Sequence, residues 1–378
     1  MKSKVIGLSQ VKATLSAALL LLTAWLATTG TVRAGAPATL ALYFIDVEGG
    51  QSTLIVTPHH RSFLVDAGWA GQGVGFIPGG PKQARDANRI LAAARDAGVS
   101  KIDYLLITHF HPDHDGGVSE LAKLIPIGTF IDHGKPSPDA VRTGPDIEPA
   151  FDAYRALLPG HPHIVPKPGD RLPIPGVDVT VVSTDRATLG QALPGSGAPN
   201  PLCGKAAIPA ADPHENPRST GVVLSYGQFR FLDVGDLTGE PLFRLACPKS
   251  LVGPVSVYLV AHHGGPDAAD PATLAAFAPQ VAIMNNGLTK GGAPGTFQSL
   301  HHVAGLEDVW QLHLSGNAGA NGNFPDGFIA NRDEGTSYWI RVEAREDGSF
   351  RILNPRTRQW KSYLPRAAGL HESGAAPQ

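Results

Sequence analysis

The sequence contains only two cysteines, Cys203 and Cys247, among 378 residues. Neither belongs to a C-x-x-C motif, which argues against the metal and redox sites built on that motif. In an oxidising compartment the pair could form one disulfide, whereas two separately buried thiols are the alternative. The spacing of the two residues does not decide between these alternatives.

Long apolar runs are absent except near the first residues. Residues 15–27 are apolar, follow Lys2, Lys4 and Lys12, and precede small residues around Ala34. This order is typical of a secretory signal peptide, and the apolar run is too short to cross a membrane comfortably. We therefore predict that residues 1–34 are a signal peptide, although an uncleaved anchor is the alternative. The mature protein is expected to be periplasmic or secreted, without a membrane segment.

An excess of basic residues is also lacking. The whole chain has a formal net charge of −2, and residues 1–34 carry four basic residues and no acidic one, so cleavage would lower the charge to about −6. Tight binding of long nucleic acid is not expected from such a chain. A small-molecule or nucleotide-like substrate remains open, because metal ions can supply positive charge locally.

What the sequence does contain is an alternation of β-rich and helical segments, which predicts a layered α/β fold. We expect one domain at residues 38–365, a long loop at 184–218 and a flexible Gly/Ala-rich tail at 366–378. A helix is predicted at 84–97 and another at about 114–124. The expected strands include 39–46, 52–57, 62–66, 102–107, 129–132, 177–183, 220–226, 229–234, 255–261, 280–284 and 308–313.

The most informative motif is His109-Phe110-His111-Pro112-Asp113-His114, which follows the apolar segment 102–107. Three imidazoles and one carboxylate within six residues are side chains of the types that bind zinc. A strand that ends in such a cluster would present the ligands at the edge of a sheet. A polar loop that is merely rich in histidine is the alternative, but the order, the spacing and the preceding strand all favour a metal site.

The H-x-H-x-D-H pattern resembles the signature of the metallo-β-lactamase superfamily. Segments 44–52, 235–240 and 261–265 also resemble the hydrolase domain of ComEC/Rec2-type competence proteins, over about residues 40–290 and without their membrane channel domain. The resemblance implies an αββα four-layer sandwich with two divalent metal ions at one sheet edge. Zn²⁺ is the expected metal, and Mn²⁺ is the alternative.

The same resemblance implies roles for individual residues. Asp236 would bridge the two ions, and Asp66 would orient the histidine loop by hydrogen bonding. Asp113 and Asp66 are the expected catalytic residues. His109 and His111 would hold the first ion, while Asp113, His114 and His262 would hold the second.

Several positions leave alternatives open. The segment before Asp236 lacks the histidine that most of the superfamily has there; Asn216 and Ser219 match the N-x-x-S of the competence-type proteins, and His214 could serve as a ligand instead. A missing imidazole would weaken the first site or favour Mn²⁺. His263 is a further candidate ligand, but adjacent residues on an extended segment point in opposite directions, so His262 is preferred. His133, His313 and Ser219 are candidates for the substrate pocket.

The expected function is that of an exported metal-dependent hydrolase in which two ions share a hydroxide nucleophile. The competence-type resemblance favours phosphoester or phosphodiester substrates. One alternative is hydrolysis of a lactone or β-lactam carbonyl by the same nucleophile. Another is a metal-stabilised binding protein without turnover. The sequence does not indicate the oligomeric state.

Overall fold

The computed structural model describes residues 39–71, 84–206, 208–209, 212–319 and 322–366. The predicted signal peptide lies outside these ranges, as does the predicted tail except for Arg366. All described residues fall within one compact unit, Ala38–Gln378. Within the described residues, no helix combines the length and the apolar character needed to span a membrane.

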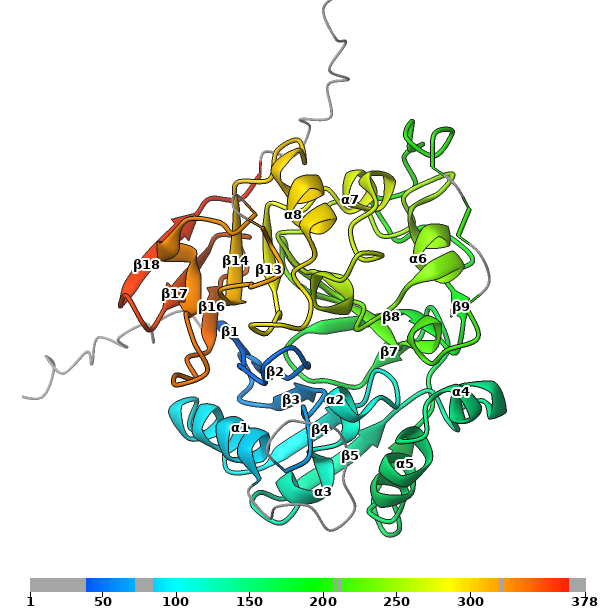
Figure 1. Cartoon of the computed structure of the whole chain (residues 1–378), viewed down its shortest axis with the longest axis vertical. Coiled ribbons are helices and arrows are strands. Elements are labelled where there is room, and N and C mark those ends of the chain that lie inside the picture. The colour runs from blue at the N-terminus through cyan, green and yellow to red at the C-terminus, as the bar shows by residue number, and fades with distance from the viewer. Residues whose placement is uncertain (1–38, 72–83, 207, 210–211, 320–321, 367–378) are drawn as a thin grey trace, which may run out of the picture. The chain divides into compact units, whose positions relative to one another are not determined.

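One mixed sheet combines the first part of the unit with its last three strands, in the order β18-β17-β16-β1-β2-β3-β4-β5-β6 (Figure 1). Strands β3 to β6 run parallel, and the remaining neighbours pair antiparallel. The strands are β1 (Leu40–Phe44), β2 (Thr53–Val56), β3 (Ser62–Val65), β4 (Ile102–Leu106), β5 (Ile127–Ile131), β6 (His163–Ile164), β16 (Ile340–Ala344), β17 (Phe350–Asn354) and β18 (Gln359–Tyr363).

The second mixed sheet has the order β15-β14-β13-β12-β11-β10-β8-β7, with β9 paired to β8. Its strands β11 to β15 run parallel, and the others pair antiparallel. The strands are β7 (Arg171–Leu172), β8 (Asp178–Thr184), β9 (Ala187–Thr188), β10 (Gly221–Tyr226), β11 (Phe229–Asp233), β12 (Val257–Leu259), β13 (Val281–Met284), β14 (Asp308–His313) and β15 (Ile329–Asn331).

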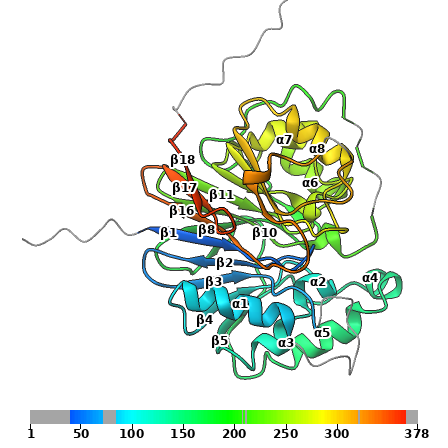
Figure 2. The same ribbon diagram turned by 60° about the vertical axis from the view of Figure 1, so that its left-hand side comes forward.

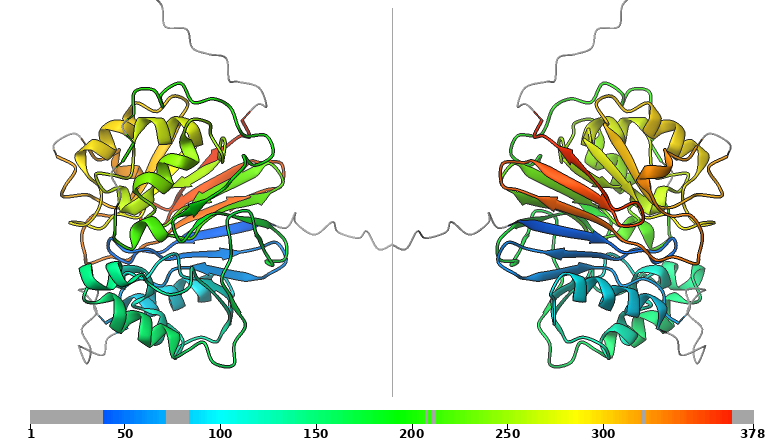
Figure 3. Two further views of the ribbon diagram at one scale, coloured as in Figure 1. Left: turned by 90° about the vertical axis from the view of Figure 1, so that its right-hand side faces the viewer. Right: turned by 90° about the vertical axis from the view of Figure 1, so that its left-hand side faces the viewer.

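Helices cover the outer face of each sheet, so the predicted αββα sandwich is confirmed (Figures 2 and 3). Helices α1 to α5 lie against the first sheet and α6 to α8 against the second. The helices are α1 (Arg85–Asp96), α2 (Pro112–Asp115), α3 (Val118–Leu121), α4 (Pro138–Thr143), α5 (Ile147–Arg155), α6 (Gly239–Ala246), α7 (Pro271–Phe277) and α8 (Pro294–His301), with 3₁₀ turns η1 (Asn216–Arg218), η2 (Ala261–Gly264) and η3 (Asp326–Phe328).

The central strands bury both faces, which explains why the sequence shows continuous apolar runs there. In β3, Phe63 and Val65 point into the core between the sheets, whereas Leu64 packs under the helices. In β11, Phe231 faces the other sheet and Leu232 faces the opposite way. Three apolar layers therefore hold the four layers of secondary structure together.

The single helix predicted at about 114–124 is wrong, because α2 and α3 are separated at Gly116 and Gly117. The Gly117 amide donates a hydrogen bond to the Gly68 carbonyl, and a Cβ at Gly117 would lie 2.1 Å from the Ala67 oxygen. This close approach to the end of β3 replaces the helical path. The short strands β6, β7, β9, β15 and β18 were not predicted, since two to five residues with little alternation leave a weak pattern.

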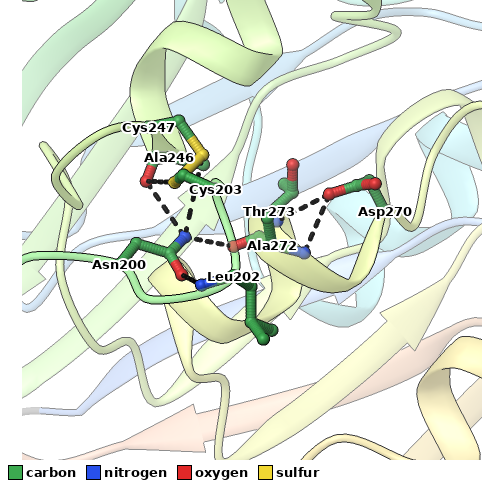
Figure 4. The surroundings of a disulfide bond; sticks show 8 residues. All are labelled: Asn200, Leu202, Cys203, Ala246, Cys247, Asp270, Ala272 and Thr273. Carbon is green, nitrogen blue, oxygen red and sulfur yellow. Dashed lines mark hydrogen bonds between the residues drawn. A yellow bond between two sulfur atoms is a disulfide. The ribbon is translucent and has the colours of Figure 1, made fainter. Parts of the chain in front are cut away.

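Cys203 and Cys247 form a disulfide, so the alternative of two separate thiols is wrong (Figure 4). The bond links the long segment before β10 to the end of α6. Asn200 strengthens the same attachment, because its Nδ2 donates to the carbonyls of Ala246 at 3.1 Å and Ala272 at 2.8 Å. The long loop is thereby fastened to the helices that cover the second sheet.

Loss of this disulfide should destabilise the protein substantially. The two cysteines are 44 residues apart, and closing a loop of that length in the unfolded chain corresponds to about 4 kcal/mol in the chain-entropy model. Urea unfolding of the Cys203→Ser/Cys247→Ser variant should show this decrease in the free energy of unfolding. The oxidised and reduced wild-type proteins serve as controls, and equal midpoints for those two forms would contradict the prediction.

Candidate metal centre

The segments expected to carry metal ligands all follow the carboxyl ends of parallel strands. Asp66 follows β3 and the histidine motif follows β4, and these strands pair in parallel. Asp236 follows β11 and the His262-His263 pair follows β12, which also pair in parallel. Carboxyl ends of parallel strands share one edge, where ligands of open α/β sheets are usually bound. The side chains of both sheets therefore meet at one edge of the sandwich.

The histidine motif turns back on itself at Pro112, the first residue of α2. His109 and His114 are fully buried, and their ring centroids lie 4.1 Å apart. His109 Nε2 lies 2.9 Å from His111 Nδ1. The three imidazoles of the motif therefore converge instead of pointing to solvent.

Asp66 holds this loop in place from the end of β3. Its Oδ1 accepts a hydrogen bond from the Thr108 amide at 2.7 Å, and its Oδ2 accepts one from the Thr108 hydroxyl at 2.7 Å. The same Oδ2 lies 2.7 Å from His114 Nδ1. A carboxylate on one ring nitrogen makes the opposite nitrogen, His114 Nε2, the one available to a metal ion.

Asp236 approaches the histidine motif through a tight turn that requires glycine. Gly235 has a φ of 55°, and a Cβ at this position would lie only 2.8 Å from Thr108 Oγ1. The Gly235 amide donates to Asp233 Oδ1 at 3.0 Å, and its carbonyl accepts from the His262 amide at 3.1 Å. The turn thus packs directly against the histidine motif of the other sheet.

The extended backbone assumed for the histidine pair is wrong. His262 and His263 have φ values of 49° and 54°, in the left-handed region. His263 is buried, and its Nε2 lies 3.0 Å from Asp113 Oδ2 and 3.1 Å from Asp236 Oδ2. The preference for His262 as the ligand beside Asp113 and His114 is corrected accordingly, because the left-handed turn places His263 there.

Among the described residues, one group of side chains converges closely enough to hold a metal ion: Asp113, His114, Asp236 and His263. Their ligand atoms are separated by 3.0, 3.1, 3.2 and 3.3 Å in four pairs. Ligand atoms on a tetrahedral zinc ion lie about 3.3 Å apart. His114 Nε2, both ring nitrogens of His263 and Asp236 Oδ1 are buried without a hydrogen-bond partner in the described part of the chain. The donor set and its spacing therefore fit a divalent ion.

Charge and burial act in opposite directions on this group. Burial by itself would raise the pKa of Asp236, but His114 and His263 hold that pKa well below its usual range. Burial by itself would lower the pKa of His114, but Asp236, Asp113 and Asp66 raise it well above the ordinary value. Asp236 is therefore kept ionised, in the form that binds a cation.

The segment before β10 brings Asn216 to the cluster and leaves His214 exposed. Asn216 Nδ2 lies 3.2 Å from His262 Nε2, and Asn216 Oδ1 is buried without a hydrogen-bond partner in the described residues. His214 makes its recorded hydrogen bonds through backbone atoms, to Asp212 and Arg186. The structure therefore places Asn216 at the site, and His214 outside the group of converging ligands.

Residues 45–192 match the family model described as "Metallo-beta-lactamase superfamily". The match covers less than half of the chain and marks this segment as similar to a metallo-β-lactamase superfamily domain. The matched residues include Asp66 and the histidine motif, whereas Asp236 and His263 follow the matched segment. No curated protein matches the chain in sequence.

Solved structures with low similarity include three metallo-β-lactamase-fold or metallo-hydrolase proteins. A metallo-β-lactamase from Cronobacter sakazakii is 17% identical with a TM-score of 0.31, over 52% of this chain and 60% of its own. The metallo hydrolase Igni18 from Ignicoccus hospitalis is 14% identical with a TM-score of 0.40, over 71% and 94%. YhfI from Bacillus subtilis is 11% identical with a TM-score of 0.41, over 75% and 98%. The chain thus spans about three fifths of the Cronobacter protein.

The three residues expected in a substrate pocket have other surroundings in this metallo-β-lactamase fold. His133 is buried with its Nε2 2.6 Å from Glu215 Oε1, which fastens the Asn216 segment to the end of β5. His313 is buried with its Nε2 2.7 Å from Asp46 Oδ1, across the two sheets. Ser219 is also fully buried. None of the three is among the residues that line the pocket of about 460 Å³ beside His262 and His263.

Lys290 was not predicted from the sequence, but it lines the pocket beside the paired histidines. The pocket has a volume of about 460 Å³ and is lined by His262, His263 and Lys290 among others. Lys290 Nζ contacts Asp113 Oδ2 and lies 4.9 Å above the Trp69 ring. The sequence feature that could have indicated Lys290 is its position after the apolar strand β13. The carboxyl end of β13 lies at the same sheet edge as the carboxyl ends of β11 and β12.

A larger cavity of about 1190 Å³ lies away from the cluster. Its lining includes Arg230, Ser256 and Gln280, which stand at or near the amino ends of β11, β12 and β13. The chemistry-bearing side chains lie at the opposite, carboxyl ends of these strands. The smaller pocket is therefore the one relevant to the metal centre.

Metal removal should lower the stability of the protein measurably. A ligand that binds the folded state at about 100 times its Kd stabilises it by about 2.7 kcal/mol. Chelator-treated protein should therefore melt at a lower temperature than the same protein with Zn²⁺ restored. The Asp236→Asn variant should show little of this increase, and an equal increase in that variant would contradict a metal site at Asp236.

Proposed function

We propose that the protein is a metal-dependent hydrolase that binds two divalent ions, Zn²⁺ by preference, and acts on phosphoesters or phosphodiesters. The observation that carries the proposal is the buried convergence of Asp113, His114, Asp236 and His263 from both sheets. The family match over residues 45–192 supports the hydrolase class. The competence-type resemblance supports the substrate class by analogy alone.

The residues of the chain would position the ions and the substrate. Asp236 would lie between the ions, His109 and His111 would hold the first, and Asp113, His114 and His263 would hold the second. Asp66 would keep His114 Nε2 directed at its ion. Bound divalent ions would lower the pKa of a water molecule and polarise the bond to be cleaved.

Lys290 supports an anionic substrate over a neutral one. The pocket that Lys290 lines opens beside His262 and His263, and this lysine is the only Lys or Arg among the residues that line it. An ammonium group beside the centre would attract a phosphoester that carries negative charge. A lactone offers no such charge.

We also propose that the protein is exported after removal of residues 1–34. The disulfide between Cys203 and Cys247 supports an oxidising compartment, because such bonds are rare in the cytosol. Intact-mass measurement of protein recovered outside the cytoplasm should give the mass that lacks these residues. Recovery of only full-length, membrane-attached protein would favour the uncleaved anchor.

The partner proposed is a small-molecule or nucleotide-like substrate, because the mature chain would carry a charge of about −6. Long nucleic acid is not proposed as a tightly bound ligand.

Turnover should distinguish the three functional hypotheses. Zn²⁺- or Mn²⁺-loaded protein is incubated with bis(p-nitrophenyl) phosphate, a lactone and nitrocefin, and we expect hydrolysis of the phosphodiester. Asp236→Asn should reduce kcat by about 100-fold or more, as is usual for a group that stabilises the transition state electrostatically.

The matched control is His214→Ala, whose side chain is exposed and outside the converging group; we expect it to retain wild-type turnover. Hydrolysis of nitrocefin alone would contradict the phosphoester proposal. Metal binding without turnover of any substrate would favour a binding protein.

A further inference from the structure

Both members of the adjacent histidine pair approach the same carboxylate oxygen. His263 Nε2 lies 3.1 Å and His262 Nε2 lies 3.9 Å from Asp236 Oδ2. On an extended backbone the two side chains would point in opposite directions. Two successive left-handed residues are strained, and such a conformation persists only where the surroundings hold it. The strained left-handed turn therefore brings both imidazoles close to the carboxylate of Asp236.

The surroundings of His262 are those of a metal ligand. Its Nδ1 lies 2.7 Å from Asp267 Oδ1, so the carboxylate favours the tautomer whose Nε2 is free to bind. His114 has the same arrangement with Asp66. His262 nevertheless stands outside the group formed by Asp113, His114, Asp236 and His263.

Further potential ligands lie near His262 Nε2 or near Asp236 Oδ2. Asn216 Nδ2 lies 3.2 Å from this atom, and Asn216 Oδ1 is buried without a hydrogen-bond partner in the described part of the chain. His109 Nε2 lies 3.9 Å from Asp236 Oδ2, the same distance as His262 Nε2, and 2.9 Å from His111 Nδ1. The imidazoles of His109 and His262 both face Asp236 Oδ2 but do not belong to the group around His263.

We propose that the histidine pair is divided between the two ions, so that His262 supplies the third imidazole of the first site and His263 completes the second. Most of the superfamily has a histidine ligand in the segment where this chain has Asn216. His262 would thereby compensate for that missing histidine. Asp267 would act as the positioning residue of His262. The inference rests on the proposed binding of two ions and assigns each of the paired histidines to one of them.

Metal content distinguishes this assignment from one in which His262 and His263 bind the same ion. Each full-length variant is dialysed against limiting free Zn²⁺, and bound zinc is measured by plasma mass spectrometry. Wild type should hold two ions, and His262→Ala and His263→Ala should each hold one. The double variant His111→Ala/His262→Ala should still hold one ion, because both changes affect the same site. The double variant His111→Ala/His263→Ala should hold none.

Two further variants test whether the loss of an ion results from misfolding instead of the loss of a ligand. His262→Gly accepts the left-handed conformation without strain and should also hold one ion, with an unchanged circular dichroism spectrum. Asp267→Asn changes a half-exposed side chain and should weaken binding of one ion by about 10- to 100-fold while the other is unaffected. His214→Ala is the matched control and should hold two ions.

Two ions in His262→Ala, or none in His111→Ala/His262→Ala, would overturn the assignment. Fewer than two ions in wild type would overturn it together with the proposed dinuclear centre. If the metal counts follow the expected pattern and no substrate is hydrolysed, the division of the histidines is supported and only the proposed hydrolase function fails.

Discussion

The buried carboxylate of Asp236 is the point on which the metal centre depends. Imidazoles from two different sheets surround its Oδ2, at 3.2 and 3.1 Å for His114 and His263 and at 3.9 Å for His109 and His262. A carboxylate out of contact with water is costly unless opposite charge compensates it. The histidines supply this compensation only if both sheets present their strand ends at the same place.

Polar contacts between the sheets hold those ends together. Gln51 Nε2 donates to both oxygens of Asp233, and the Thr220 amide donates to the Thr108 carbonyl at 2.8 Å. His313 pairs with Asp46 across the same gap. Below this polar edge the two sheets are joined by apolar packing, such as the edge-to-face contact of Phe44 and Phe231 at 5.6 Å. The sandwich is thus polar at the edge where chemistry is proposed and apolar between the sheets.

Much of the architecture could be predicted because it follows from the apolar periodicity of single strands and helices. The segments around β4, α1 and β14 have apolar periodicity that matches their final structure closely. The break between α2 and α3 could not be predicted, since it arises from the contact of Gly117 with the end of β3. Likewise, His133 and His313 were expected at a pocket, but their carboxylate partners, Glu215 and Asp46, come from distant parts of the chain.

The sequence by itself determined the layered α/β class and the position of the H-x-H-x-D-H motif, because strand periodicity and motif spacing are local properties. The resemblance to the metallo-β-lactamase superfamily supplied the four-layer sandwich and the candidate ligands outside the motif. Only the tertiary structure decided which of the paired histidines stands beside Asp113, because the left-handed turn at His262 and His263 has no local signature. It also placed Lys290 at the centre and joined Cys203 to Cys247. These outcomes depend on distances between residues far apart in the chain, which are set only when the strands, helices and loops pack together.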